Sequence, residues 1–307
     1  MRPPMSIAAA TTDSADPAAS GPRPSAAPDD GRTLAARLQL YAAILRTAIA
    51  ERLAYRADFA VKTAFQFLPL ITQIFLWGAI FGAGTDAARG EIEGYRYGEI
   101  ISYYLLTMVS RGFSSMPGLA GGIARDVRDG QIKRFLVQPL DLLGFLFWHR
   151  VAHKLVYFTI AGFVLATAFY LLRGYFPGWP EPAVMAAFVA SLLMGFLLGF
   201  LLESLLGLVA FWFLEVSSLL FIYMMLNYFL SGHMIPLDFF PEPFSTWMQA
   251  LPFKYLAYVP PAIFLGRYET HELPGLLLSE AAWIVALLIA NRWLLARGVR
   301  RYGAFGG

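Results

Sequence analysis

Residues 183–230 read AVMAAFVASLLMGFLLGFLLESLLGLVAFWFLEVSSLLFIYMMLNYFL, a run that is apolar almost without pause and holds no basic residue. One helix needs roughly 20 apolar residues to cross the ~30 Å hydrocarbon core of a bilayer. The run is far longer than one crossing needs, so the chain must turn back inside it, near 211–217. Glu215 and Ser217 are the polar residues available to that turn. Two membrane spans are therefore predicted, at 183–206 and 211–231.

The composition of the whole chain agrees with a membrane protein. Hydrophobic residues make up 58% and charged residues 15% of the 307 residues, whereas soluble domains have about 45–50% apolar and about 25% charged residues. Pro117 is expected to kink one of the remaining spans. Four further apolar blocks are long enough to cross a bilayer, at 62–82, 99–121, 146–172 and 278–296. We therefore predict an all-α integral membrane protein with six transmembrane helices.

The segments around the spans complete the expected domain plan. Residues 1–32 are rich in Pro, Ala and Ser and lack a long apolar run, which predicts a disordered cytosolic tail. Residues 33–57 carry an apolar stripe at helical spacing, which predicts an amphipathic helix at the membrane interface. The six-span domain then occupies 58–301, and 302–307 form a C-terminal tail.

The segment between the last two spans is unusual. Residues 231–277 are rich in Pro and aromatic side chains and are too polar to cross the membrane as one helix. Short helices are predicted within it at Pro243–Leu251 and Pro260–Gly266. We expect these short helices of the outer segment to dip into the interface.

The distribution of Lys and Arg predicts the orientation. Basic residues gather before the first span, between the second and third spans and after the last, for example Arg128, Lys154 and Arg297. The other face holds few, among them Arg173 and Arg267. Because cytosolic flanks carry the excess of Lys and Arg, both termini are expected in the cytosol. The net charge of +3 is attributed to this topology, and no nucleic-acid binding is expected.

Few residues suggest catalysis. Cysteine is absent, which excludes disulfides and thiolate chemistry. No Gly-rich loop is followed by Lys and Ser or Thr at Walker A spacing, so the chain is not expected to hydrolyse ATP. His149 and His153 share a helix face and could ligate a metal, but a histidine-box enzyme needs more imidazoles than the four His present. We predict no catalytic residues and no metal site.

Three polar residues fall inside predicted spans. Arg111 lies in the second span, Glu203 in the fourth and Asn227 in the fifth. Ionisable residues inside a membrane are costly and often functional, so these three are candidates for a translocation path. A structural ion pair or hydrogen-bonded cluster explains them equally well, with Glu203 as the acidic partner expected for Arg111. Gly195 and Gly199 form a GxxxG pattern, which favours close helix packing, here within the chain rather than between chains.

The stretch IARDVRDGQIKRFLVQPLDLLGF at 123–145 is the most informative charged loop. A helix is expected to continue out of the membrane to Asp129, with Gly130 supplying its C-terminal cap. Pro139 with Asp141 marks the start of the next helix. The charges of the first part alternate in sign: Arg125, Asp126, Arg128 and Asp129. This pattern suits docking onto a polar protein groove, and a plain connector is the alternative.

Three stretches of the chain together resemble a known family. They are DGQIKRFLVQPL at 129–140, LLGLVAFW at 205–212, and SGHMIPLDFFP at 231–241 followed by LPFKYLAYVPPAIFLG at 251–266. In these places, and over about 34–301, the chain resembles the ABC type-2 transporter permeases. These are the membrane subunits of ABC exporters, whose ATPase is a separate polypeptide.

The resemblance implies a set of partners. It implies separate ATPase subunits that carry the ATP and Mg, and a second permease in a homodimer or heterodimer. It places the chain in the plasma (inner) membrane, in contact with lipid and without a cofactor of its own. The matched residues do not identify a substrate.

The resemblance also implies roles for parts of the chain. The loop at 123–141 corresponds to the coupling helix, and the first, second and fifth spans to the walls of the path. The segment 232–276 corresponds to an outer re-entrant helical segment that caps the path, and its matched positions are Gly232, Pro236, Pro241 and Pro252.

Two other classes of membrane protein are alternatives. A secondary carrier is expected to place ionisable residues or broken helices in several spans, whereas only Arg111 qualifies firmly here. A membrane-embedded enzyme needs a nucleophile, a base or a metal constellation, and the sequence offers none that can be assembled.

Overall fold

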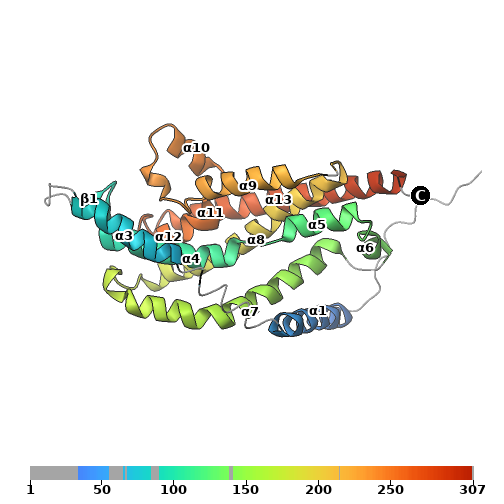
Figure 1. Ribbon diagram of the computed structural model, residues 1–307, viewed down its shortest axis with the longest axis horizontal. Helices are drawn as coiled ribbons and strands as arrows, with labels where there is room; N and C mark the ends of the chain where they lie inside the picture. The colour runs from blue at the N-terminus through green and yellow to red at the C-terminus, as the bar shows by residue number, and fades with distance from the viewer. Residues whose placement is uncertain are drawn as a thin grey trace, which may run out of the picture.

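The computed structural model is an elongated helical bundle (Figure 1). It describes residues 34–54, 65, 68–83, 90–137, 141–213 and 215–305. The predicted tail 1–32 and Pro139 lie outside these ranges. The helices are α1 Leu34–Ala54, α3 Leu68–Ala83, α4 Tyr97–Ser114, α5 Leu119–Arg128, α6 Lys133–Val137, α7 Leu142–Leu171, α8 Pro182–Leu208, α9 Ser217–Leu230, α10 Phe244–Ala250, α11 Lys254–Ala257, α12 Val259–Phe264 and α13 Leu273–Phe305.

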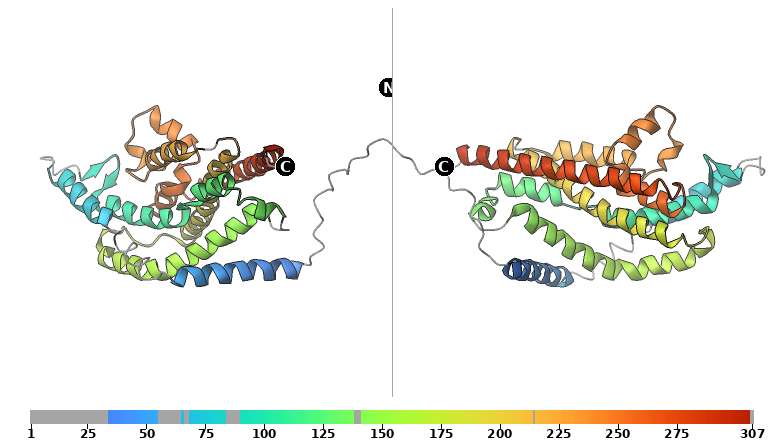
Figure 2. Two further views of the ribbon diagram at one scale, coloured as in Figure 1. Left: turned by 45° about the vertical axis from the view of Figure 1, so that its right-hand side comes forward. Right: turned by 180° about the vertical axis from the view of Figure 1, so that it is seen from behind.

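The two ends of the bundle differ in content. At one end, on the right of Figure 1, lie α5, α6 and the C-terminal end of α13; we call it the loop end. The opposite end carries α10 and a small hairpin of β1 Glu91–Ile92 and β2 Tyr95–Arg96; we call it the cap end. Figure 2 shows α13 running along the bundle between the two ends.

Three described helices are long and apolar enough to cross a membrane. They coincide with α7, α8 and α13, while α3 and α9 are apolar but shorter. The turn predicted between the fourth and fifth spans is confirmed, because the chain reverses between α8 and α9 and the Ser217 amide donates to the Glu215 carboxylate at 2.8 Å. Short helices are also present where they are predicted in the outer segment, as α10 and α12.

The second predicted span differs from the expectation of one kinked helix over 99–121. The helix ends at Ser114, and α5 begins only at Leu119. Pro117 has no backbone N–H and disfavours helical backbone in the residue before it, while Gly118 has a φ of +74°. These two residues interrupt the span rather than bend it. We call residues 115–118 the α4–α5 joint.

Helix α8 is the centre of the bundle and packs against α13, α5, α4 and α12. Its glycines allow backbones to approach closely. A Cβ at Gly199 would overlap with the Ser114 carbonyl of α4, and one at Gly195 would lie 3.1 Å from the Tyr255 carbonyl. The GxxxG pattern therefore serves packing within the chain, as the sequence predicts.

Helix α1 lies against the N-terminal half of α7 (Figure 1). The Tyr41 ring stacks on the Trp148 ring with centroids 5.5 Å apart. The helix predicted at 33–57 is thus present at 34–54, whereas its place at the membrane interface stays a prediction.

We expect Gly199→Ala to destabilise the protein by about 1–3 kcal/mol, the usual cost of overpacking. A Gly-to-Ala change in a helix normally stabilises a protein by about 0.4–1 kcal/mol. A loss of stability in Gly199→Ala would therefore show that the Ser114 carbonyl lies too close to admit a Cβ. The control is Gly162→Ala in α7, where no atom of the described residues lies within 4 Å of the new Cβ. Thermal unfolding of the purified variants measures the difference. Equal melting temperatures would contradict the packing described for α8.

Candidate functional site

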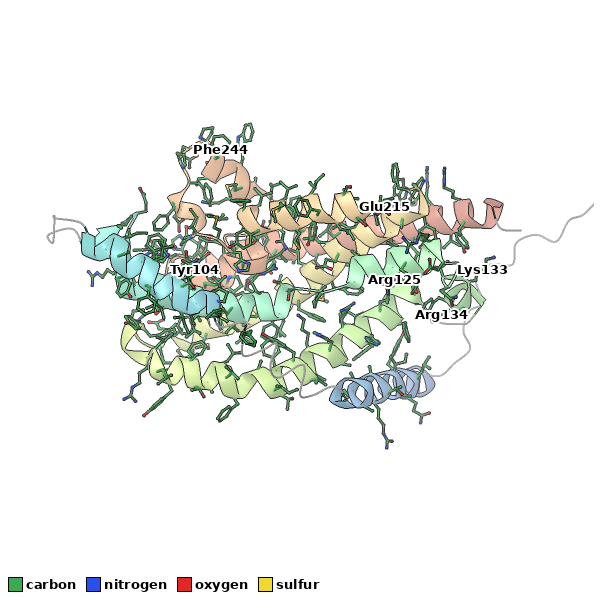
Figure 3. The ribbon with its side chains drawn as sticks, viewed as in Figure 1. Tyr104, Arg125, Lys133, Arg134, Glu215 and Phe244 are labelled. Carbon is green, nitrogen blue, oxygen red and sulfur yellow. The ribbon has the colours of Figure 1, made fainter. Side chains whose placement is uncertain are left out.

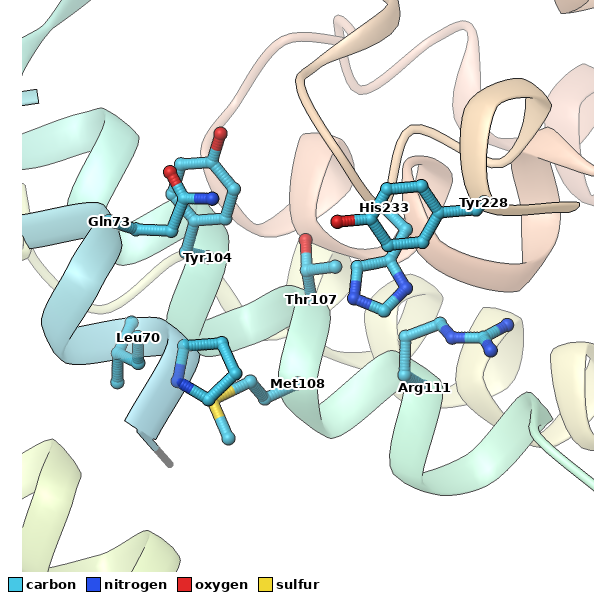
Figure 4. A pocket seen from close by; sticks show the side chains of 9 residues that line it. Leu70, Gln73, Tyr104, Thr107, Met108, Arg111, Tyr228 and His233 are labelled. Atoms are coloured by element: carbon cyan, nitrogen blue, oxygen red, sulfur yellow. The ribbon is translucent and has the colours of Figure 1, made fainter. Parts of the chain in front are cut away.

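A cavity of about 220 Å³ lies between three helices on the cap-end side of the bundle (Figure 4). It is lined by α3, α4, α9 and the turn after α9, through Pro69, Leu70, Gln73, Tyr104, Thr107, Met108, Arg111, Tyr228 and His233. These helices correspond to the first, second and fifth predicted spans. The wall is apolar at Leu70 and Met108 and carries uncharged hydrogen-bonding groups at Gln73 and Tyr228.

Three polar atoms in the cavity wall lack partners. Within the described ranges, Gln73 Oε1, Thr107 Oγ1 and His233 Nδ1 are buried without a hydrogen bond. Burial, with a smaller effect of the Arg111 charge, lowers the pKa of His233 to about 4, so the imidazole is neutral at physiological pH. A neutral imidazole and an amide oxygen can both take part in hydrogen bonds with a polar guest.

Arg111 contributes to the cavity wall with its aliphatic part. Figure 4 shows its guanidinium pointing away from Leu70 and Gln73. The charge interacts electrostatically with Tyr223 of α9 and Glu203 of α8. Glu203 is thus the carboxylate that acts on Arg111. Asn227 is buried on α9, and its Oδ1 has no partner among the described residues.

The α4–α5 joint carries a second cluster of charges. Lys154 Nζ of α7 donates to the carbonyls of Gly112 and Ser115, both at 2.5 Å. Arg150 Nη1, one turn earlier on α7, donates to the Pro117 carbonyl at 2.9 Å. The Glu203 carboxylate lies beside the backbone amides of Met116 and Ala120. Cations thus contact carbonyls of the joint, and the Glu203 carboxyl group lies near its amides.

The sequence analysis missed two buried charges. Lys154 is only 8% exposed and Glu280 of α13 is fully buried, with Ser191 of α8 donating to its carboxylate at 2.9 Å. Lys154, counted above among the flanking charges, has its ammonium at the joint. Both residues lie inside predicted spans, at 146–172 and 278–296, so the signal that identified Arg111 applied to them as well.

At the loop end, the predicted helix boundaries are confirmed. Helix α5 ends at Arg128, and Gly130 has the positive φ of a C-terminal cap, +75°. Asp141 caps α7, with its carboxylate accepting from the Gly144 amide at 2.8 Å. The same carboxylate forms a bidentate ion pair with Arg292 of α13, at 2.6 and 3.0 Å.

The charges of this loop are not equivalent. Arg125, Arg128 and Asp129 are exposed, whereas Asp126 is half-buried and pairs with Arg134 at 3.4 Å. Figure 3 shows Arg125 and Arg134 at the loop end. A surface of mixed sign is therefore available for contact with another protein, and Asp126 serves mainly the fold of the loop.

A network of side chains fixes the cap end. Asp238 accepts hydrogen bonds from the hydroxyls of Tyr95 at 2.6 Å and Tyr258 at 2.7 Å. Burial, reinforced by the Asp238 charge, raises the pKa of Tyr95, so its hydroxyl remains a donor. The Arg267 guanidinium lies 3.5 Å from the centroid of the Tyr95 ring and pairs with Glu99 at 3.2 Å.

The predicted cap residues shape the backbone of the segment. Gly232 has a φ of +77°, and a Cβ there would lie 2.7 Å from Tyr258 Cβ, so the position requires glycine. The Gly232 carbonyl accepts from the Tyr103 hydroxyl of α4. Pro236, Pro241 and Pro252 each stand shortly before a short helix, at Leu237–Phe239, α10 and α11. Glycine and proline residues thus determine where the backbone of the cap turns.

We expect Asp238→Ala to lower the stability of the protein by at least about 1–3 kcal/mol, because two buried tyrosine hydroxyls lose their acceptor. Glu242→Ala is the control, since Glu242 is an exposed carboxylate of the same segment. Thermal unfolding of both variants in lipid nanodiscs provides the measurement. An equal loss of stability in the two variants would show that the hydrogen bonds of Asp238 stabilise the protein no more than an exposed carboxylate does.

The comparisons with known proteins agree with this architecture. A search of curated proteins returns no match to the chain. The model of the ABC-2 family transporter protein matches residues 67–306, which covers the cavity, the joint, the loop and the cap. The chain therefore belongs to the ABC-2 family of transporter proteins, membrane permeases that carry no ATPase domain.

Proposed function

We propose that this chain is the permease subunit of an ABC exporter and that separate ATPase subunits supply the ATP and Mg. The observation that carries the proposal is the course of the second span. Its first part, α4, lines the cavity, and its second part, α5, leads directly into the charged loop. One segment therefore joins a candidate substrate site to a candidate docking surface.

In this proposal the loop end faces the cytosol and the chain lies in the plasma membrane. The basic residues around α5, α6 and the end of α13 support this orientation through the positive-inside rule. The cap end, with its prolines and tyrosines, then faces outward and closes the path from that side.

The cavity is proposed to be one half of the translocation path. A row of apolar side chains on α3 and α9 is exposed beside it: Ile71, Phe75, Phe221, Ile222 and Met225. A second permease, identical or different, would cover this face and complete the path. Arg111 is then a polar element of its wall. Asn227 lies on α9 next to the lining residue Tyr228, and Glu203 acts on the wall only through Arg111.

Coupling follows from the same geometry. ATP-driven closure of the ATPase pair pushes on the exposed charges Arg125, Arg128 and Asp129, and α5 passes the displacement toward α4. Rigid-body motion of the two permeases then exposes the path outward.

A secondary carrier is the second candidate. It is favoured by the ionisable residues Lys154, Glu203 and Glu280, which lie inside predicted spans in addition to Arg111. Carriers place such residues around the substrate or the coupling ion. Here Lys154 and Glu203 contact the backbone of the joint and do not line the cavity. Their contacts favour a structural role, so the exporter permease is the better supported function.

The orientation can be tested with single cysteines, because the chain has none of its own. Glu242→Cys should react with a membrane-impermeant maleimide in intact cells, since Glu242 lies in the cap. Arg128→Cys should react only after permeabilisation. Both positions are exposed, so access to the reagent decides the outcome, and the reverse pattern would invert the topology.

The docking surface can be tested by charge reversal. We expect Arg125→Glu with Arg128→Glu to reduce co-purification of the ATPase subunit at least about tenfold, equivalent to a loss of about 1.4 kcal/mol in binding, with normal abundance of the permease. The matched control is Arg297→Glu with Arg300→Glu, two exposed residues near the same end. Gly130→Val should also weaken the complex, because a β-branched residue strains a positive φ. If the ATPase subunit co-purifies normally with both loop variants, the loop is only a connector between helices.

A further inference from the structure

We propose that Lys154 and Glu203 are positioning residues that hold the α4–α5 joint stiff, so that displacement of the loop reaches the cavity wall. The inference rests on the proposed function and adds to it the element that transmits the motion. It concerns two side chains on α7 and α8, which belong to neither the cavity nor the docking surface.

The backbone groups at the joint need hydrogen-bond partners from other helices. The last turn of a helix leaves carbonyl groups without intrahelical partners, and the first turn of the next leaves free amides. In an apolar environment each such group must find a partner inside the protein. Lys154 serves the carbonyls of Gly112 and Ser115, and Glu203 lies at the amides of Met116 and Ala120.

The charges of Lys154 and Glu203 complement the partial charges of the two helix ends. A helix C-terminus carries a partial negative charge and an N-terminus a partial positive charge. The ammonium of Lys154 lies at the C-terminus of α4, and the carboxylate of Glu203 lies at the N-terminus of α5. Arg150 adds a hydrogen bond to the Pro117 carbonyl at 2.9 Å. The C-terminus of α4 therefore meets a cation, and the N-terminus of α5 meets a carboxyl group.

Local packing at Gly118 does not set the turn of the joint. Gly118 has a φ of +74°, and no atom of the described residues lies within 4 Å of the place where its Cβ would be. The contact of Gly199 with the Ser114 carbonyl locates the end of α4, and Ile123 of α5 packs on Gly207 of α8. The two helices are thus held separately on α8, and the charged contacts act on the residues between them.

These contacts have a mechanical consequence. When the joint is stiff, α4 and α5 move as one lever, and a push at Arg128 changes the packing around Met108. When the joint is loose, α5 turns about Gly118 and the cavity wall stays in place. ATP binding and cavity opening are then uncoupled without loss of the complex.

The test uses Met108→Cys in the cavity wall as a reporter, in membrane vesicles that hold the permease with its ATPase. The rate of modification by N-ethylmaleimide is measured without nucleotide and with ATP plus vanadate. We expect nucleotide to change the rate about fivefold or more in the reporter background, within the usual range of coupling between sites. Adding Lys154→Met should reduce this ratio below about twofold, with unchanged co-purification of the ATPase.

Lys154→Arg is the conservative control, because a guanidinium can still donate to both carbonyls, and it should restore the nucleotide response. A purely structural lysine would instead show itself in abundance and thermal stability, and its loss would leave the ratio intact. If Lys154→Met does not accumulate, Glu203→Gln decides, since it removes the charge and keeps the shape.

Four results overturn the inference. A full nucleotide response in Lys154→Met overturns it, as does a full response in Glu203→Gln where Lys154→Met does not accumulate. Failure of Lys154→Arg to restore the response shows that the lysine does not act through its hydrogen bonds. If the reporter background itself ignores nucleotide while bound to the ATPase, the proposed coupling function fails first, and the inference fails with it.

Discussion

The interruption of the second span is the constraint around which the bundle is built. A bilayer offers no hydrogen-bond partners to a backbone that leaves the helical path, so the protein must supply them. Helices α7 and α8 do so with Lys154, Arg150 and Glu203. The central position of α8 follows from the same need, because only a helix with glycine at 199 can approach the end of α4 closely enough to present a carboxylate there.

The cap end meets the same constraint with different chemistry. Its backbone turns at Gly232 are served by neutral tyrosine hydroxyls, as the Tyr103 contact with the Gly232 carbonyl and the Tyr104 contact with the Met234 carbonyl show. Tyrosine combines an apolar ring with one hydrogen-bonding group. The cap thus uses neutral hydroxyl groups where the joint uses the cations Lys154 and Arg150.

The sequence predicted much of this fold because its strongest signals are local. The apolar blocks, the turn at Glu215, the Gly130 cap and the Asp141 helix start each depend on neighbours in the chain. The break at the joint was harder to foresee, because Pro117 is compatible with a kinked helix in a membrane and only partners from α7 and α8 make a full interruption tolerable. The role of Lys154 depends on a contact between residues 39 and 42 positions apart, which no periodicity reveals. Likewise Arg111 was visible as a buried charge, but not the direction of its guanidinium.

The length of α13 has a consequence for how this chain can change in evolution. The helix has 33 residues and therefore extends about 50 Å at 1.5 Å per residue, well beyond the ~30 Å hydrocarbon core. The helix contacts the loop twice, through Arg292 to Asp141 and through Tyr302, whose ring lies 6.0 Å from Lys133 Nζ. Inserting or deleting one residue between these contacts would rotate one of them by about 100° relative to the other. This stretch of the helix therefore tolerates substitution far more readily than any change in the number of its residues.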